Sequence, residues 1–195
     1  DPDMEHVRQT LELSQPDVVG IGMSTLMLGE GLEIAEMAHQ LRAKVVLGSA
    51  HPTMFPADMM KHDCVDAVVI GEGEVPLVNL LKMWQSGLCH PVKGAHVRDR
   101  KADTIYESNE RDPVLNLDAL PFPAWDLIDM DAYFDAWGQL DSVQPGLRGV
   151  NLSGSRGCPF TCTFCAETLH TMFGRKLRQR SPESLIAAAP ASKVQ

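Results

Sequence analysis

The chain has 195 residues, which is room for one large domain or two small ones. Hydrophobic residues make up 44% and charged residues 22%, so we expect an ordinary buried core and exclude a disordered tail. The net charge of −9 argues against broad nucleic-acid binding, because that function needs a basic surface.

The first 87 residues alternate amphipathic helices with short apolar runs. Helical spacing of apolar residues predicts helices at 4–15, 30–42, 56–62 and 75–86. Runs rich in β-branched residues predict buried strands at 18–23, 44–48 and 66–71. The alternation predicts an α/β domain with a parallel sheet, doubly wound as in Rossmann- or flavodoxin-like folds. Three strands are few for such a sheet, so we expect an earlier part of the domain to precede this chain.

The pattern changes after the fourth helix. Residues 95–107 flank a polar turn and predict a hairpin at the edge of the first domain. Residues 120–126 form a Pro-punctuated linker, in which Phe122 and Trp125 are expected to pin the chain to a neighbouring surface. Residues 149–154 predict a strand that opens a second domain. The predicted divisions are therefore 1–92, 93–145 and 146–195, with the last domain incomplete.

Three loops follow the predicted strands, at the edge where open α/β sheets bind ligands. They contain small or polar residues that let a large planar ligand approach the backbone. The candidate binding residues in these loops are Ser24, Thr25, Leu26, Gly48, Ser49, His51, Gly71, Glu72 and Gly73. Ordinary strand-to-helix turns are the alternative reading of each loop, and His51 taken alone is more often a hydrogen-bonded loop residue than a metal ligand.

The strongest functional signal is the spacing of Cys158, Cys162 and Cys165, C-x₃-C-x₂-C. Three thiolates can hold one face of a four-iron cluster and leave one iron open to a ligand. The alternative is a structural zinc site with His170 as the fourth ligand. Residues 151–180 carry a net charge of +4, which favours either an anion site beside these thiols or a solvated helix face.

The cysteine count and the apolar runs indicate the cellular compartment of the protein. The cysteine count is five, an odd number, and Cys64 and Cys89 lie far from the cluster motif, where we expect buried thiols. A reducing compartment is therefore favoured over a secreted disulfide framework. The longest uncharged runs are too short for a membrane helix, and the first residues lack a leader pattern. These observations predict a cytoplasmic protein without a transmembrane segment.

The segment from Ser155 to Cys165 resembles the cluster motif of the radical S-adenosylmethionine enzymes, most closely those with an N-terminal cobalamin-binding domain. The resemblance extends over most of the chain. It includes 16–22, the His51-Pro52-Thr53 loop, Gly71-Glu72-Gly73-Glu74, the linker 120–125 and Arg180-Ser181-Pro182-Glu183. It implies a cobalamin-binding α/β domain followed by the first strand and cluster loop of a radical S-adenosylmethionine (β/α) barrel.

The resemblance also implies cofactors and site residues. Cys158, Cys162 and Cys165 would hold a [4Fe–4S] cluster, S-adenosylmethionine would bind the open iron, and Phe164 would lie against its adenine. The reduced cluster would cleave S-adenosylmethionine to a 5′-deoxyadenosyl radical. In such an enzyme the cofactors supply the reactive groups and the protein binds and orients them. The three loops would contact cobalamin. A small-molecule substrate and an electron donor such as flavodoxin or ferredoxin are implied as partners.

Two departures from the family pattern limit the prediction. No D-x-H-x-x-G string is present. We therefore expect one of two cases: either the motif lies ahead of this chain, or cobalamin binds without a histidine ligand on cobalt. The chain also ends before the second barrel strand and its Gly-Gly-Glu segment. The leading hypothesis is a methyltransferase acting on an unactivated carbon or phosphorus centre. The alternatives are a cyclase of the anaerobic tetrapyrrole type, a non-catalytic corrinoid-binding module and a zinc-stabilised interaction domain.

Overall fold

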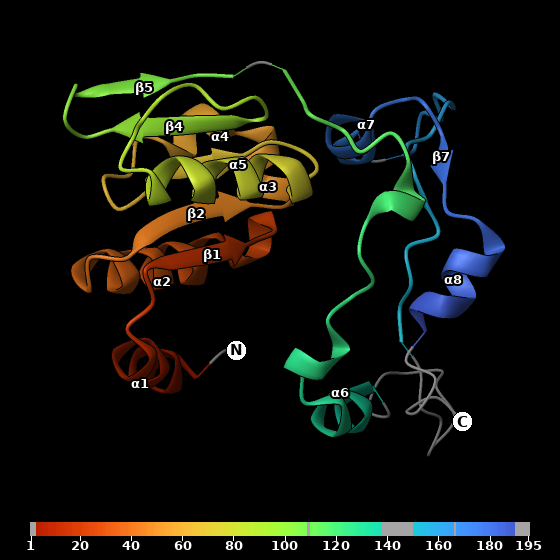
Figure 1. Ribbon diagram of the computed structural model, residues 1–195, viewed down its shortest axis with the longest axis horizontal. Helices are drawn as coiled ribbons and strands as arrows, with labels where there is room; N and C mark the ends of the chain where they lie inside the picture. The colour runs from red at the N-terminus through yellow and green to blue at the C-terminus, as the bar shows by residue number, and fades with distance from the viewer. Residues whose placement is uncertain (1–2, 109, 138–149, 166, 190–195) are drawn as a thin grey trace. The chain divides into compact units, whose positions relative to one another are not determined.

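The structure, a computed structural model, describes residues 3–108, 110–137, 150–165 and 167–189. The chain divides into two compact units (Figure 1). The first consists of 1–114 together with 157–175, and the second of 115–156 together with 176–195. The first unit is discontinuous in sequence, so the segment with the three clustered cysteines belongs to the same unit as the N-terminal α/β fold.

A five-stranded sheet organises the first unit, in the order β1-β2-β3-β4-β5. The strands are β1 Val18–Gly22, β2 Lys44–Gly48, β3 Ala67–Val69, β4 Ala95–Asp99 and β5 Thr104–Tyr106. The first three are parallel, and β4 and β5 form an antiparallel hairpin on the β3 edge. The predicted parallel sheet and edge hairpin are therefore confirmed, and together they make a mixed sheet.

Helices cover both faces of this sheet. Their bounds are α1 Met4–Ser14, α2 Leu28–Gln40, α3 Ala50–Met54, α4 Pro56–Met59 and α5 Glu74–Gln85. Val45 and Leu47 face a cluster with α2 and α4, whereas Val46 faces the opposite cluster with α5. Successive strand residues point to opposite faces, so each strand contributes to both cores. The predicted α/β class is confirmed, although the described strands follow one another in chain order without the reversal of a doubly wound sheet.

The second strand is followed by a helix that the sequence did not predict. β2 ends at Gly48 and α3 begins at Ala50, so of the predicted loop residues Gly48, Ser49 and His51 only Ser49 lies outside a strand or helix. The predicted helix at 56–62 ends already at Met59. Pro52 lies in the first turn of α3, where a missing N–H costs no intrahelical hydrogen bond. A five-residue helix carries too little periodicity for its apolar pattern to be read from sequence.

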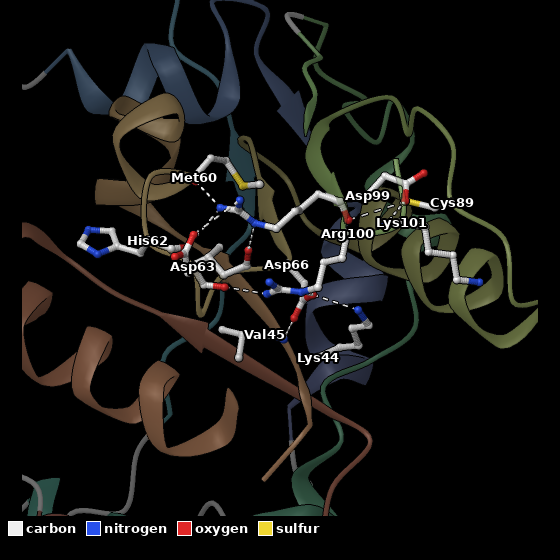
Figure 2. Close-up of polar contacts among 12 residues, drawn as sticks. Lys44, Val45, Met60, His62, Asp63, Asp66, Cys89, Asp99, Arg100 and Lys101 are labelled. Carbon is white, nitrogen blue, oxygen red and sulfur yellow. Dashed lines mark hydrogen bonds and ion pairs between the residues drawn. The ribbon is translucent and has the colours of Figure 1, made fainter. Parts of the chain in front are cut away.

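An ionic network ties the hairpin to the amino ends of β2 and β3 (Figure 2). Asp66 is buried and accepts hydrogen bonds from Lys44 Nζ at 2.9 Å, Val45 N at 3.0 Å and Arg100 Nε at 3.0 Å. Burial alone would raise the pKa of Asp66, but the bonds from Lys44 and Val45 and the nearby Arg100 hold it below its usual value. Arg98 donates to the carbonyls of Met60 and Val65.

In the part of the second unit that the structure describes, the helices and strands are short. They are η2 Leu117–Ala119, η3 Trp125–Leu127, α6 Met130–Trp137, β6 Ser155–Arg156, β7 Arg178–Gln179 and α8 Pro182–Ala188. Trp125 Nε1 donates to the Ala188 carbonyl at 2.8 Å, which confirms that this aromatic pins the linker, whereas Phe122 is half exposed. Asp118 accepts hydrogen bonds from the Ser181 amide at the start of α8.

The strand predicted at 149–154 is wrong over the residues described. Residues 150–154 are irregular, and the antiparallel pair begins only at Ser155. An apolar run becomes a strand only where a neighbouring strand lies alongside, and here β7 meets the chain after the run has ended. Within the described residues, no helix is both long and apolar enough to cross a membrane.

Candidate functional site

The carboxyl ends of β1, β2 and β3 meet at one edge of the sheet, because the three strands are parallel. The predicted binding residues follow these ends. Ser24 precedes the 3₁₀ turn η1 Thr25–Met27, Ser49 precedes α3, and Gly71 to Gly73 follow β3 and lead into α5. The structure therefore brings the three predicted loops to a common edge, which we call the carboxyl edge.

The first two loops are joined through His51, which begins the buried stretch of α3. Thr25 Oγ1 and His51 Nδ1 share a hydrogen bond of 3.0 Å, and the His51 amide donates to the Met23 carbonyl at 3.2 Å. The residue His51 is 8% exposed, and its ring centroid lies 5.0 Å from that of Phe55. His51 is thus held in one orientation by both loops.

The second and third loops are joined through Thr53. Its side chain is buried, and its Oγ1 accepts a hydrogen bond from the Gly71 amide at 3.0 Å. Gly71 has a φ of +79°, a conformation that favours glycine. Glu72, which follows, is buried as well. The sequence analysis assigned no function to Thr53. Its hydrogen bond to Gly71 could not be predicted, because it depends on the register of β2 against β3.

The carboxyl edge presents open space and apolar side chains. A Cβ built on Gly48 would meet no atom within 4 Å, so that backbone is accessible to a ligand. Leu26 is 96% exposed, and Met27 and Phe55 are about half exposed. Ser49 has a φ of +74°, and such strained positions concentrate at ligand sites. Open backbone and exposed apolar side chains are the features that a broad, flat ligand with apolar faces would contact.

The three clustered cysteines lie on the loop that leads to α7, Thr168–Phe173. None of the three forms a disulfide, Cys158 is half buried, Cys162 and Cys165 are exposed, and Phe164 is 92% exposed. The Cys158 amide donates to the Gly174 carbonyl at 3.2 Å and closes the segment. Among the described residues no three His, Cys, Asp or Glu side chains are gathered for a metal ion. The donor set suits an iron–sulfur cluster, but its sulfurs are not drawn together.

The helix that follows the cysteines packs against α3, the helix that contains His51. Both helices belong to the first unit, and Figure 1 shows α7 in blue beside the end of the unit that carries α3. The cysteine segment therefore approaches the carboxyl edge from a position more than 100 residues further along the chain. The sequence predicted the cysteine motif and the loops of the carboxyl edge, but it did not predict that they belong to one compact unit.

Comparison with known families identifies the fold of the first unit. Residues 1–81 match the family model of the B12 binding domain. The match covers 81 of the 195 residues and identifies a B12-binding domain in this part of the chain alone. The predicted kinship with cobalamin-dependent radical S-adenosylmethionine proteins is confirmed by the relatives and the structural neighbours that follow.

Curated relatives align with nearly the whole chain. An uncharacterized methyltransferase of Pyrococcus horikoshii is 32% identical over 92% of this chain and 37% of its own length. The anaerobic magnesium-protoporphyrin IX monomethyl ester cyclase of Cereibacter sphaeroides is 30% identical over 93% of this chain and 29% of its own. The chain therefore spans about a third of these relatives.

Solved structures agree with the fold. The cobalamin-dependent S-adenosylmethionine radical enzyme OxsB, with aqua-cobalamin and S-adenosylmethionine bound, superposes with a TM-score of 0.72 at 20% identity. That match covers 98% of this chain and 26% of OxsB. The radical S-adenosylmethionine methyltransferase TsrM of Kitasatospora setae gives 0.60 at 19% identity, over 93% of this chain and 36% of TsrM. At such identities the likeness concerns the fold alone.

Proposed function

We propose that the chain forms the cobalamin-binding and cluster-bearing part of a radical S-adenosylmethionine enzyme that methylates an unactivated carbon or phosphorus centre of a small molecule. The observation that carries the proposal is the packing of α7, directly after the three cysteines, against α3 at the carboxyl edge. It brings the residues suited to an iron–sulfur cluster and those suited to a corrinoid into one compact unit.

The residues would divide the work as follows. Cys158, Cys162 and Cys165 would hold a [4Fe–4S] cluster, and the exposed ring of Phe164 would cover the adenine of S-adenosylmethionine. Gly48 and the exposed apolar Leu26 would lie against the corrin. When bound, the cluster and cobalamin supply reductive cleavage of S-adenosylmethionine and a methyl-carrying metal. An electron donor such as flavodoxin or ferredoxin would reduce the cluster.

Iron incorporation tests the cysteine assignment. After anaerobic reconstitution with iron and sulfide, the unaltered chain should bind about four irons. Replacing Cys158, Cys162 or Cys165 with alanine should abolish iron uptake, because two thiolates do not hold a stable cluster. Cys64→Ala is the matched control, since that thiol is buried in the core of the first unit. Full loading in Cys162→Ala, or zinc in place of iron in the unaltered chain, would contradict the assignment.

The absorption spectrum of bound cobalamin tests whether a histidine of this chain ligates cobalt on its lower face. We expect His51 to position the loops rather than to ligate cobalt, because no D-x-H-x-x-G string accompanies it. Metal-bound histidines commonly hydrogen-bond through their second nitrogen, so the Thr25 bond alone does not decide the matter. His51→Ala should leave the spectrum unchanged. A histidine-ligated spectrum in the unaltered chain that disappears in His51→Ala would overturn this expectation.

A cyclase reaction is the second candidate, and one observation favours it. The cyclase of Cereibacter sphaeroides is 30% identical to this chain, close to the 29% of the cytidylyl-2-hydroxyethylphosphonate methyltransferase of Streptomyces wedmorensis. Both candidates use the same carboxyl edge and the same cysteines. Methyl transfer from labelled S-adenosylmethionine by the whole enzyme separates them, because a cyclase would release no labelled methyl product.

A further inference from the structure

Two close approaches from elsewhere in the first unit meet the C-terminal turn of α7. Arg111 Nη1 donates to the His170 carbonyl at 2.8 Å. A Cβ built on Gly71 would lie only 2.8 Å from the Met172 carbonyl, so the backbone of α7 passes directly over this glycine. Carbonyls in the last turn of a helix lack intrahelical partners or share them, and they favour a cationic neighbour.

We infer that Arg111 and Gly71 are positioning residues that latch the cluster-bearing segment onto the carboxyl edge, an inference that rests on the proposed function. The two residues act at one place, because the Cβ position of Gly71 is also 3.6 Å from Arg111 Cδ. Gly71 supplies the close approach and the positive φ, and Arg111 supplies the donor. We refer to the pair as the latch.

The latch connects the cysteine loop to the corrinoid loops through short links. On one side, the Cys158 amide bonds to the Gly174 carbonyl, one residue after α7, so a fixed α7 also fixes the base of the cysteine loop. On the other side, the Gly71 amide bonds to Thr53, two residues after His51 in α3. Gly71 therefore lies between the helix of the cluster segment and the helix of the cobalamin loops.

The consequence for the reaction is geometric. Two cofactors that exchange a methyl group through one site must be held at a fixed separation, and a misplacement of about 1 Å costs on the order of 100-fold in rate. Cys162 and Cys165 are exposed, so these two side chains are not packed into the core of the first unit. The latch would set the separation of the cofactors through the protein backbone, before either cofactor binds.

Amide hydrogen exchange of the cofactor-free chain tests the latch directly. Arg111→Ala should raise the exchange of residues 171–174 by about five- to thirtyfold, corresponding to about 1–2 kcal/mol, with β2 unchanged. Arg111→Lys should restore part of the protection, and Arg8→Ala, which removes an exposed arginine from α1, should leave it intact. Unchanged exchange in Arg111→Ala, or a uniform rise over the whole sheet, would overturn the inference.

Gly71→Ala provides a second variant that does not depend on charge. A methyl group there meets the Met172 carbonyl and a strained φ, so α7 should lose protection even with Arg111 present. Gly87→Ala is its control, because Gly87 also has a positive φ, of +71°, but a Cβ there meets no atom within 4 Å. Equal exchange of 171–174 in the two variants would contradict the latch.

A spectroscopic measurement separates the latch from the proposed function. With both cofactors bound, cob(II)alamin and the reduced cluster should show magnetic coupling that weakens in Arg111→Ala, while iron content and cobalamin retention stay unchanged. Unchanged coupling would overturn the positioning role. If the chain binds neither cofactor and the exchange results still hold, the latch stands and the proposed function fails.

Discussion

The histidine on β4 is buried where a protonated imidazole is disfavoured. His96 is 4% exposed, lies opposite Val68 in the sheet, and receives no hydrogen bond at Nδ1 from the residues described. Burial lowers the pKa of His96, and the carboxylate of Glu107 opposes this only in part. The side chain is therefore neutral in the folded chain at neutral pH.

His96 should make folding stability depend on pH in a defined window. Its folded pKa is depressed, so its contribution is fully present above the unfolded value of about 6.5 and is lost as the pH falls through the folded value. The free energy of unfolding should decrease below pH 6.5 by at most about 1.4 kcal/mol per pH unit from this group. Urea unfolding at pH 7.5 and 5.5 measures it. His96→Leu should flatten this window, and an undiminished slope would refute the prediction.

At the scale of elements, Asp66 anchors the amino ends of β2 and β3 and the end of the β4 strand. Asp66→Ala should lower the free energy of unfolding by about 2–3 kcal/mol, because it removes three hydrogen bonds, two of them from cations, and leaves the Val45 amide unsatisfied. The comparison is Asp63→Ala, an exposed carboxylate 4.0 Å from Arg98, which should cost less than about 0.5 kcal/mol.

The hydrogen bonds of Asp66 also predict that the fold loses stability at acid pH. The pKa of Asp66 is depressed in the folded state, so its contribution is present above about pH 3.9 and is lost as the pH falls through the folded value. This window lies below that of His96, so the two slopes can be read in one pH series. Denaturant midpoints that match between Asp66→Ala and Asp63→Ala at pH 7 would show that the network is not an anchor.

The sequence predicted the elements whose pattern is local and long enough to read. The β-branched runs at β1, β2 and β3 and the polar turn between β4 and β5 specify strands without reference to the rest of the chain. α3 was missed because five residues around Pro52 carry little periodicity, and the strand at 149–154 was predicted from composition where no partner strand lies alongside.

The candidate site divides in the same way. The loops at the carboxyl edge could be predicted because parallel strands end at one edge, and the cysteines because their spacing alone points to a metal. The bonds from Thr25 to His51 and from Arg111 to His170 could not be predicted, because they join residues 26 and 59 positions apart. Such contacts follow from tertiary packing, which no local pattern encodes.

At the scale of the whole molecule, the discontinuous first unit should respond to cobalamin as one body. A ligand that binds only the folded chain stabilises it by about 2.7 kcal/mol at a concentration 100 times the dissociation constant. Hydroxocobalamin should therefore raise the midpoint of thermal unfolding, and it should protect amides both in β2 and in α7, although 120 residues separate them.

Gly48→Leu provides the decisive comparison for this prediction. The glycine faces open space, so leucine should fold without strain yet fill the volume that the corrin needs, at a cost of roughly 1–3 kcal/mol in binding. Ser24→Trp should act similarly from the first loop. Far-UV circular dichroism should stay unchanged in both variants, while the cobalamin-induced rise in the unfolding midpoint shrinks.

Because Gly20 also faces open space but lies within β1, away from the carboxyl edge, Gly20→Ala should keep the full rise. If all three variants keep it, the corrinoid binds elsewhere.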